Sequence, residues 1–245
     1  DRDNTIITWD DHANIKMPTG GLDSEAAVKG KPMGTFRTYT LKVQGSYITL
    51  KNITIENNAA KLGQAVSLHL EGDHILVQNC RLLGNQDTVY TGIANNRSAF
   101  YDCYIEGTTD FIFGPGRAWF ENCEIRSKAN SYITAASSPA GQEYGYVFNK
   151  CKLTAEPGID KVYLGRPWRP YAATLFMNCE MGSHIRPEGW HNWGKHSNEQ
   201  TARYSEYNNH GSGAATKARV AWSRQLTKKE AAKVTIKNVF GEEAW

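Results

Sequence analysis

Short apolar runs separated by a recurring polar step dominate the pattern of this chain. An apolar residue, one further residue and a polar residue precede the same marker position six times. Runs of strand length, such as residues 65–70 and 74–77, alternate or cluster apolar side chains between the markers. The pattern therefore predicts many short strands. The marker residues are Ile53, Cys80, Cys103, Cys123, Cys151 and Cys179.

The markers recur at intervals of 20 to 28 residues. An interval that varies while the marker is kept is typical of a solenoid whose coils carry loops of different length on one side. We therefore predict an all-β fold, a right-handed parallel β-helix with loops flanking a groove. Helical periodicity is scarce until residues 228–234, where we expect one short C-terminal helix capped by Thr227. Residues 1–245 are expected to form a single domain, because no Pro/Ser-rich linker divides them.

All five cysteines occupy the marker position. Neither a CxxC motif nor a Cys/His cluster is present, so an inward-facing column of small side chains is favoured over a metal or redox centre. Neighbouring coils bring Cα atoms to a distance that permits a disulfide. Cys103 and Cys123, which have the shortest spacing, are the candidate pair in an oxidising compartment.

Two aspartates occupy equivalent positions in successive copies of the repeat. Asp87 lies seven residues after Cys80, and Asp110 lies seven residues after Cys103. In a solenoid, the two carboxylates would stack on adjacent strands roughly 5 Å apart. Two like charges at that separation cannot both ionise at an ordinary pKa, so the pair is a candidate active site.

Three blocks of the sequence resemble the signature blocks of pectin methylesterases. They span residues 84–90, 107–114 and 164–168, and they occur in the order typical of that family. The stretches 63–66, 188–193 and 211–215 are similar to its flanking blocks. The resemblance covers nearly the whole chain. It implies a carbohydrate esterase that removes methyl groups from methyl-esterified homogalacturonan and releases methanol.

The residues themselves also supply the groups that ester hydrolysis needs. Ester hydrolysis needs a nucleophile, a proton donor for the alcohol and hydrogen-bond donors for the oxyanion. Asp110 would be the nucleophile, kept ionised by a charge-assisted hydrogen bond from Arg166. Asp87 would have a raised pKa and act first as acid and then as base. Gln86 and Gln64 could direct amide donors at the oxyanion, and neither a metal nor a cofactor is required.

Aromatic side chains in and near these blocks suit a polysaccharide, because sugar rings present apolar faces to aromatic rings. The histidines show neither metal-ligand spacing nor a Ser/His/Asp order, so we assign them no role. The candidate substrate-binding residues are Trp168, Tyr90, Phe113 and Trp193.

Two other functional classes could use the same residues. Two carboxylates about 5 Å apart also suit a retaining glycosidase, and paired acidic residues can hold Ca²⁺ for polyuronate cleavage. A non-catalytic sugar-binding solenoid is the third possibility. Gln86 beside Asp87 favours the esterase, because a glycosidase has little use for amide oxyanion donors. A calcium site would need more converging oxygen ligands.

The charge and hydropathy of the chain limit the kinds of partner that it is expected to bind. The net charge is +3, and lysine and arginine are dispersed, so no nucleic-acid partner is expected. No apolar run approaches membrane-spanning length, and this chain carries no signal peptide. We expect a monomer that is secreted or periplasmic and does not bind membranes. Residues 1–7 read as a turn leading into a strand, so we also expect an N-terminal capping segment to be missing.

Overall fold

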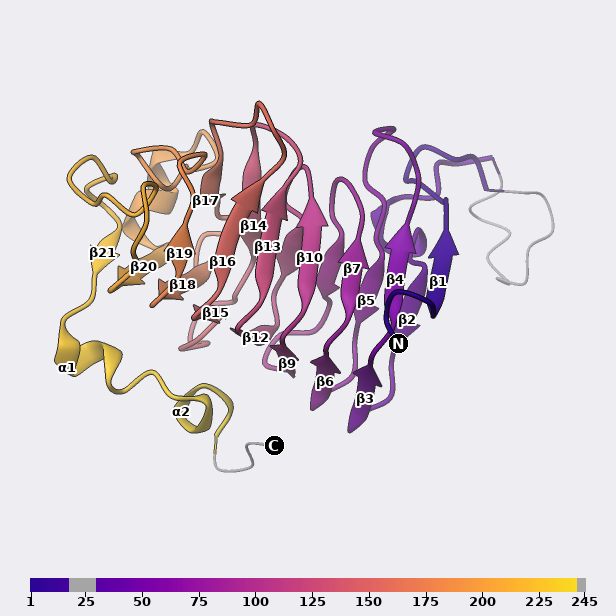
Figure 1. The fold of residues 1–245 in the computed structure, drawn as a ribbon, viewed down its shortest axis with the longest axis horizontal. Coiled ribbons are helices and arrows are strands. Elements are labelled where there is room, and N and C mark those ends of the chain that lie inside the picture. Colours follow the sequence, from indigo (N-terminus) through magenta and orange to yellow (C-terminus); the bar gives the residue numbers. More distant parts are fainter. Residues whose placement is uncertain (18–29, 242–245) are drawn as a thin grey trace.

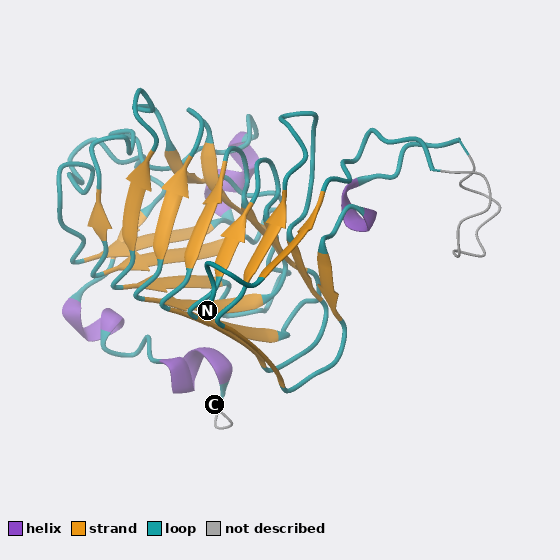
Figure 2. Cartoon of the chain, turned by 45° about the vertical axis from the view of Figure 1, so that its right-hand side comes forward, coloured by secondary structure: helices purple, strands orange, loops and turns teal. Residues whose placement is uncertain are grey.

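The computed structural model describes residues 1–17 and 30–241. Its strands form three sheets that run side by side along one long axis (Figures 1 and 2), and every pair of neighbouring named strands is parallel. After β1, each coil from β2 to β19 contributes one strand to each sheet. This arrangement is the predicted parallel β-helix.

The strands of each sheet follow one another along the axis. The first sheet contains β1 (Ile6–Trp9), β4 (Thr54–Asn57), β7 (Arg81–Leu83), β10 (Tyr104–Gly107), β13 (Glu124–Ser127), β16 (Lys152–Ala155) and β19 (Glu180–Met181). The second contains β2 (Leu41–Val43), β5 (Leu68–Leu70), β8 (Val89–Thr91), β11 (Ile112–Gly114), β14 (Tyr132–Ala136) and β17 (Tyr163–Gly165). The third contains β3 (Ile48–Lys51), β6 (Ile75–Gln78), β9 (Arg97–Tyr101), β12 (Arg117–Glu121), β15 (Tyr146–Asn149), β18 (Ala173–Met177), β20 (Arg203–Tyr207) and β21 (Arg224–Gln225).

The core lies inside the coil and consists of like residues stacked in rows. Parallel pairing places the apolar residue that precedes each marker directly above its counterpart. Four phenylalanines form one such row, with ring centroids 4.3 to 4.5 Å apart. Burying each ring stabilises the fold by about 1.5–3 kcal/mol relative to leaving it exposed. The row consists of Phe100, Phe120, Phe148 and Phe176.

The polar residue before each marker makes the corner of a coil. These residues have φ between 49° and 58°, the left-handed region that Asn and Asp enter more readily than most side chains. Some of them also bond along the axis, as Asn79 Nδ2 donates to Asn52 Oδ1 over 2.8 Å. The polar step seen in the sequence is therefore a turn signal. The corner residues are Asn52, Asn79, Asp102, Asn122, Lys150 and Asn178.

The marker cysteines form a buried interior column, as predicted, but the disulfide considered for Cys103 and Cys123 is not formed. All five cysteines lie in the described part of the chain, and all are free. Side chains at matching positions of adjacent strands point in the same direction rather than toward each other. The Cys103 thiol donates to Val77 O and the Cys123 thiol to Phe100 O, each on a neighbouring coil.

The helices are short. The predicted short C-terminal helix is present and begins as expected, with Thr227 as its cap and a capping box with Glu230. It ends at Ala231, three residues before the predicted end, and a second short helix follows it. The chain leaves the first helix early, and Val234 and Ile236 pack against the third sheet. The helices are α1 (Lys228–Ala231) and α2 (Ile236–Phe240), with 3-10 turns η2 (Thr35–Arg37) and η3 (His196–Gln200).

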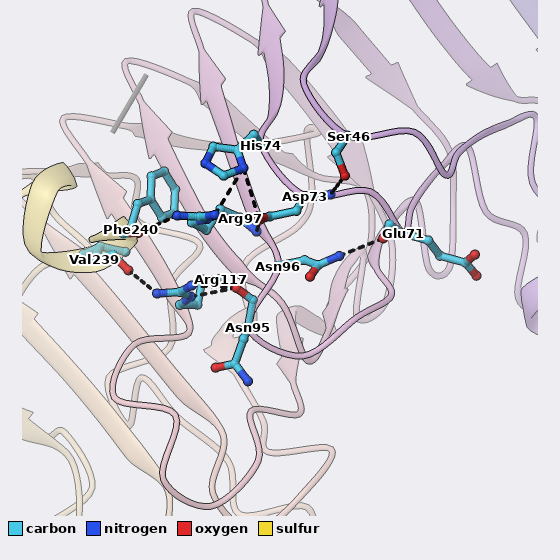
Figure 3. A network of polar contacts seen from close by, with 10 residues as sticks. All are labelled: Ser46, Glu71, Asp73, His74, Asn95, Asn96, Arg97, Arg117, Val239 and Phe240. Atoms are coloured by element: carbon cyan, nitrogen blue, oxygen red, sulfur yellow. Dashed lines mark hydrogen bonds and ion pairs between the residues drawn. The ribbon is translucent and has the colours of Figure 1, made fainter. Parts of the chain in front are cut away.

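Residues 226–240, which we call the C-terminal tail, run back along the outside of the third sheet (Figures 1 and 2). Val239 and Phe240 are buried against the outward side chains of that sheet. Arg117 Nη1 donates to Val239 O and Arg97 Nη1 to Phe240 O, both over 3.0 Å (Figure 3). Asp73 accepts from Arg97 over 2.6 Å and helps to orient it. The arginines thus satisfy carbonyls that the end of α2 would leave unpaired.

Candidate active site

The two aspartates lie side by side at the entrance to the second sheet. Asp87 lies two residues before β8, and Asp110 lies two residues before β11. The first residues of these strands, Val89 and Ile112, are paired in register. The Asp87 N–H donates to Thr109 O over 3.0 Å, which fixes the two coils against each other. Both aspartates adopt positive φ, 69° and 51°, and both are buried. Aspartate enters this left-handed region more readily than most residues, so both acids can form the tight corner that leads into their strands.

An open cavity of about 290 Å³ brings the predicted residues together. A larger cavity of about 370 Å³ lies between the C-terminal tail and the third sheet, but the described residues that line it include no pair of carboxylates from adjacent coils. We therefore assign the site by its chemistry rather than its size. Eight of the nine predicted residues line the smaller cavity: Gln64, Gln86, Asp87, Asp110, Phe113, Arg166, Trp168 and Trp193.

Arg166 holds Asp110 with two parallel hydrogen bonds. Its Nε donates to Oδ1 over 2.9 Å and its Nη2 to Oδ2 over 2.7 Å. The backbone of Arg166 continues from β17, where its N–H donates to Thr134 O. Gly165 makes this approach possible, because a Cβ there would lie 2.0 Å from Thr134 Oγ1. A bidentate bond of this kind fixes the carboxylate in orientation as well as charge.

The environments of the two acids separate their pKa values. Burial raises the pKa of Asp110, and the hydrogen bonds and charge of Arg166 oppose that rise. Burial and the nearby charge of Asp110 raise the pKa of Asp87 well above its ordinary value. In the described part of the chain, no donor bonds the Asp87 carboxyl, so Asp87 is the better place for a proton shared by the pair.

The two glutamines lie on adjacent coils, where Gln64 and Gln86 form an isolated parallel bridge. The N–H of Ala65 donates to Gln86 O over 3.0 Å. Among the described residues, neither side-chain amide has a hydrogen-bond partner, and both line the cavity. Their amide donors are therefore available to a bound molecule.

The four predicted substrate-binding aromatic residues differ in how they lie relative to the cavity. Phe113 and Trp168 line the cavity with ring centroids 6.0 Å apart. Tyr90 stacks behind Phe113 at 4.6 Å and is absent from the lining. Trp193 lines the cavity, and its ring centroid lies 3.9 Å from the guanidinium carbon of Arg166. The four predicted residues thus form one aromatic cluster, in which Tyr90 supports rather than lines the cavity.

Two aromatic residues at the site were missed by sequence reasoning. Phe36, on η2, lines the cavity and lies 4.9 Å from Tyr90. It precedes the first repeat, so the repeat pattern gave no signal for it. Tyr132 packs on Arg166 with its ring centroid 3.9 Å from the guanidinium carbon. Tyr132 follows Asp110 by one coil, so extending the register of the two aspartates would have pointed to it.

Within the described residues, no group of three or more His, Cys, Asp or Glu side chains is arranged to hold a metal ion. In the same part of the chain, no helix is both long enough and apolar enough to cross a membrane.

Comparisons with known proteins agree with one another. A family model described as Pectinesterase matches residues 4–243. Pectinesterase 31 of Arabidopsis thaliana is 39% identical over 229 residues, which cover 93% of this chain and 70% of that protein. Pectin methylesterase from carrot has a TM-score of 0.86 and 30% identity, with 100% of this chain and 76% of that chain covered. A pectin methylesterase in complex with a hexasaccharide has a TM-score of 0.79 and 29% identity, with 98% and 80% covered.

Proposed function

This chain belongs to the pectinesterase family, and we propose that Asp110 and Asp87 together carry out its reaction. Its function is that of a carboxylic ester hydrolase acting on pectin, which yields methanol and de-esterified pectin. The observation that carries the assignment of roles is the difference between the two acids. Arg166 bonds both oxygens of Asp110, and no donor in the described part of the chain bonds the carboxyl of Asp87.

Asp110 acts as the nucleophile. Its carboxylate attacks the carbonyl carbon of the methyl ester, and a new C–O bond forms as the carbonyl oxygen becomes an oxyanion. The amide groups of Gln64 and Gln86 face the same cavity and donate hydrogen bonds to that oxyanion. Asp87, protonated because its pKa is raised, gives its proton to the departing methoxide. Methanol leaves, and the substrate stays joined to Asp110 as an acyl-enzyme.

The second half of the reaction uses the same groups in reverse. Asp87, now a carboxylate, takes a proton from water while the water oxygen attacks the acyl carbon. The bond to Asp110 breaks, which restores its carboxylate beside Arg166 and the proton on Asp87. The released uronic acid ionises, so each turnover adds one proton to the medium.

The cavity supports a polysaccharide substrate. It is open to solvent, and Phe113 and Trp168 contribute aromatic side chains to its lining. Sugar rings stack on such faces. A homogalacturonan chain could therefore pass through the groove while one methyl ester lies beside Asp110. The structural relative described as a complex with a hexasaccharide is consistent with this substrate class.

The decisive experiment is a product assay on methylated pectin. The protein should release methanol and lower the pH of the medium, without new reducing ends or unsaturated uronides. Reducing ends without methanol would instead indicate a glycosidase, and unsaturated uronides a lyase. Binding without any product would indicate a sugar-binding solenoid.

We also propose that the protein works outside the cytoplasm, as a secreted or periplasmic monomer that does not bind membranes. A polymer of this kind is too large to cross a membrane, so its esterase must meet it outside. Size-exclusion chromatography with light scattering tests the oligomeric state. A mass of one chain at micromolar concentration is expected, and a dimer would contradict the proposal.

A further inference from the structure

Arg166 lies between two aromatic rings that the proposed mechanism does not use. Its guanidinium carbon is 3.9 Å from the ring centroid of Tyr132 and 3.9 Å from that of Trp193. We infer that Tyr132 and Trp193 are positioning residues, which hold the guanidinium so that its edge meets both oxygens of Asp110. The inference deepens the proposed function and rests on it, because the two rings act through the nucleophile.

The shape of the guanidinium explains why two rings are effective. The group is planar, and all its N–H donors lie in that plane. A ring stacked on each face leaves only the edge free to donate, and the cation is attracted to both π faces. That edge carries the two bonds to Asp110. Rotation of the guanidinium out of this plane would break at least one of them. The Arg166 side chain is 20% exposed, so without the rings water could compete for it.

Tyr132 is held in place by the coil. The N–H of Asp110 donates to Tyr132 O over 2.8 Å, so the nucleophile and the first ring share a backbone bond. Tyr163, paired in register one coil further on, stacks on Tyr132 with ring centroids 5.3 Å apart and planes 12° apart. The ring under Arg166 therefore belongs to the regular row that continues from the two aspartates.

Trp193 is held by a loop rather than by a strand. Its backbone has φ of 64°, and its N–H donates to His191 Nδ1 over 3.0 Å. The N–H of His191 donates in turn to Gly165 O, the residue just before Arg166. The His191 ring also packs against Tyr132, with centroids 5.4 Å apart. His191 thus links both rings to the strand end that carries Arg166.

This arrangement changes the role expected of Trp193. A tryptophan that only binds sugar would use its face for the substrate, and its loss would raise KM. Here one face of Trp193 lies against Arg166. Its loss should instead lower kcat and weaken the ionisation of Asp110, which moves the acid limb of the kcat/KM profile to higher pH.

The test compares Tyr132→Leu and Trp193→Leu with Tyr132→Phe and Trp193→Phe. Each leucine variant should lower kcat by about 10-fold or more, as small misplacements of catalytic groups do, with little change in KM. Its acid limb should move to higher pH. Each phenylalanine variant keeps a π face and should recover most of both losses. Thermal melting confirms that each variant is folded. The leucine and phenylalanine pair at either position is a complete test by itself.

Tyr104→Leu is the matched control, because Tyr104 lies under Arg81 at 5.7 Å on the first sheet, away from the cavity. It should leave kcat and the acid limb unchanged. Folded leucine variants that raise KM alone, or phenylalanine variants no better than leucine, would overturn the inference. Asp110→Asn distinguishes a failure of the proposed function from a failure of the positioning role. If that variant keeps its activity, the proposed function fails. If it is inactive while the leucine variants match the wild type, only the positioning role fails.

Discussion

Asp87 and Asp110 occupy the same register position on neighbouring coils, yet among the described residues only Asp110 is bonded to a cation. The repeat makes the two residues equivalent in backbone, and Arg166, arriving from β17, makes them different in charge. One acid can then stay ionised to attack while the other holds a proton to donate. The predictions below depend on that difference.

Asp110→Asn should abolish methanol release, because an amide cannot attack the ester as a carboxylate does. The variant should also form no acyl-enzyme, which mass spectrometry of the protein after incubation with methylated pectin can verify. A folded variant that still releases substantial methanol would rule out Asp110 as the nucleophile.

Asp87→Asn should still bind pectin but lose proton transfer, at a cost of roughly 10²–10⁴-fold in kcat. Because burial raises the pKa of Asp87, its contribution to stability is present in acid and is lost as the pH rises through its folded-state pKa. The neutral amide suffers no such loss. The variant should therefore melt at a higher temperature than the wild type at alkaline pH, and the difference should vanish near pH ~3. An equal difference at all pH values would contradict this reading.

Arg166→Lys should impair kcat/KM by about 10²-fold or more. A lysine ammonium is a point charge and cannot reproduce the planar fork that bonds both oxygens of Asp110. With the fork gone, burial dominates and the pKa of Asp110 should rise further. The acid limb of kcat/KM, measured by methanol release, should move to higher pH. An unmoved limb would mean that Arg166 does not control the ionisation of Asp110.

His184 should make the fold sensitive to acid. Burial lowers its pKa to about 4 from an ordinary 6.5, and its Nε2 has no hydrogen-bond partner among the described residues. Its contribution to stability is therefore present above pH 6.5 and is lost as the pH falls through about 4. His184→Gln should flatten the fall in melting temperature over that window. His210→Gln is the matched control, because His210 is exposed and its side chain has no bonding partner among the described residues, so the slope should be unchanged.

The parts of the site that follow the repeat could be predicted, and the parts that depend on coil contacts could not. The spacing from Cys80 to Asp87 and from Cys103 to Asp110 was enough to place the two acids together. The same register gives the position of Tyr132 one coil after Asp110. Its packing on Arg166 could not be predicted, because it depends on how far an arginine from one coil reaches back over another.

The same limit applies to the ends of the chain. Thr227 was recognisable as a helix cap from its own short context, and the capping box is present. The break between α1 and α2 was not, because it depends on packing against a sheet formed much earlier in the chain. Phe36 reaches the cavity from a segment outside the repeats, so its position was equally invisible.

The C-terminal tail has a consequence for how the molecule unfolds. In a solenoid each coil contacts mainly its neighbours, so such proteins can lose their coils one after another. Here Phe240 is bonded to Arg97, 143 residues earlier, and Val239 to Arg117, 122 residues earlier. The tail also packs across β9, β12, β15 and β18. A middle coil cannot unfold without releasing the C-terminal tail, and the tail cannot dock before those coils have formed. The tail therefore converts a chain of neighbouring contacts into one cooperative unit and completes folding last.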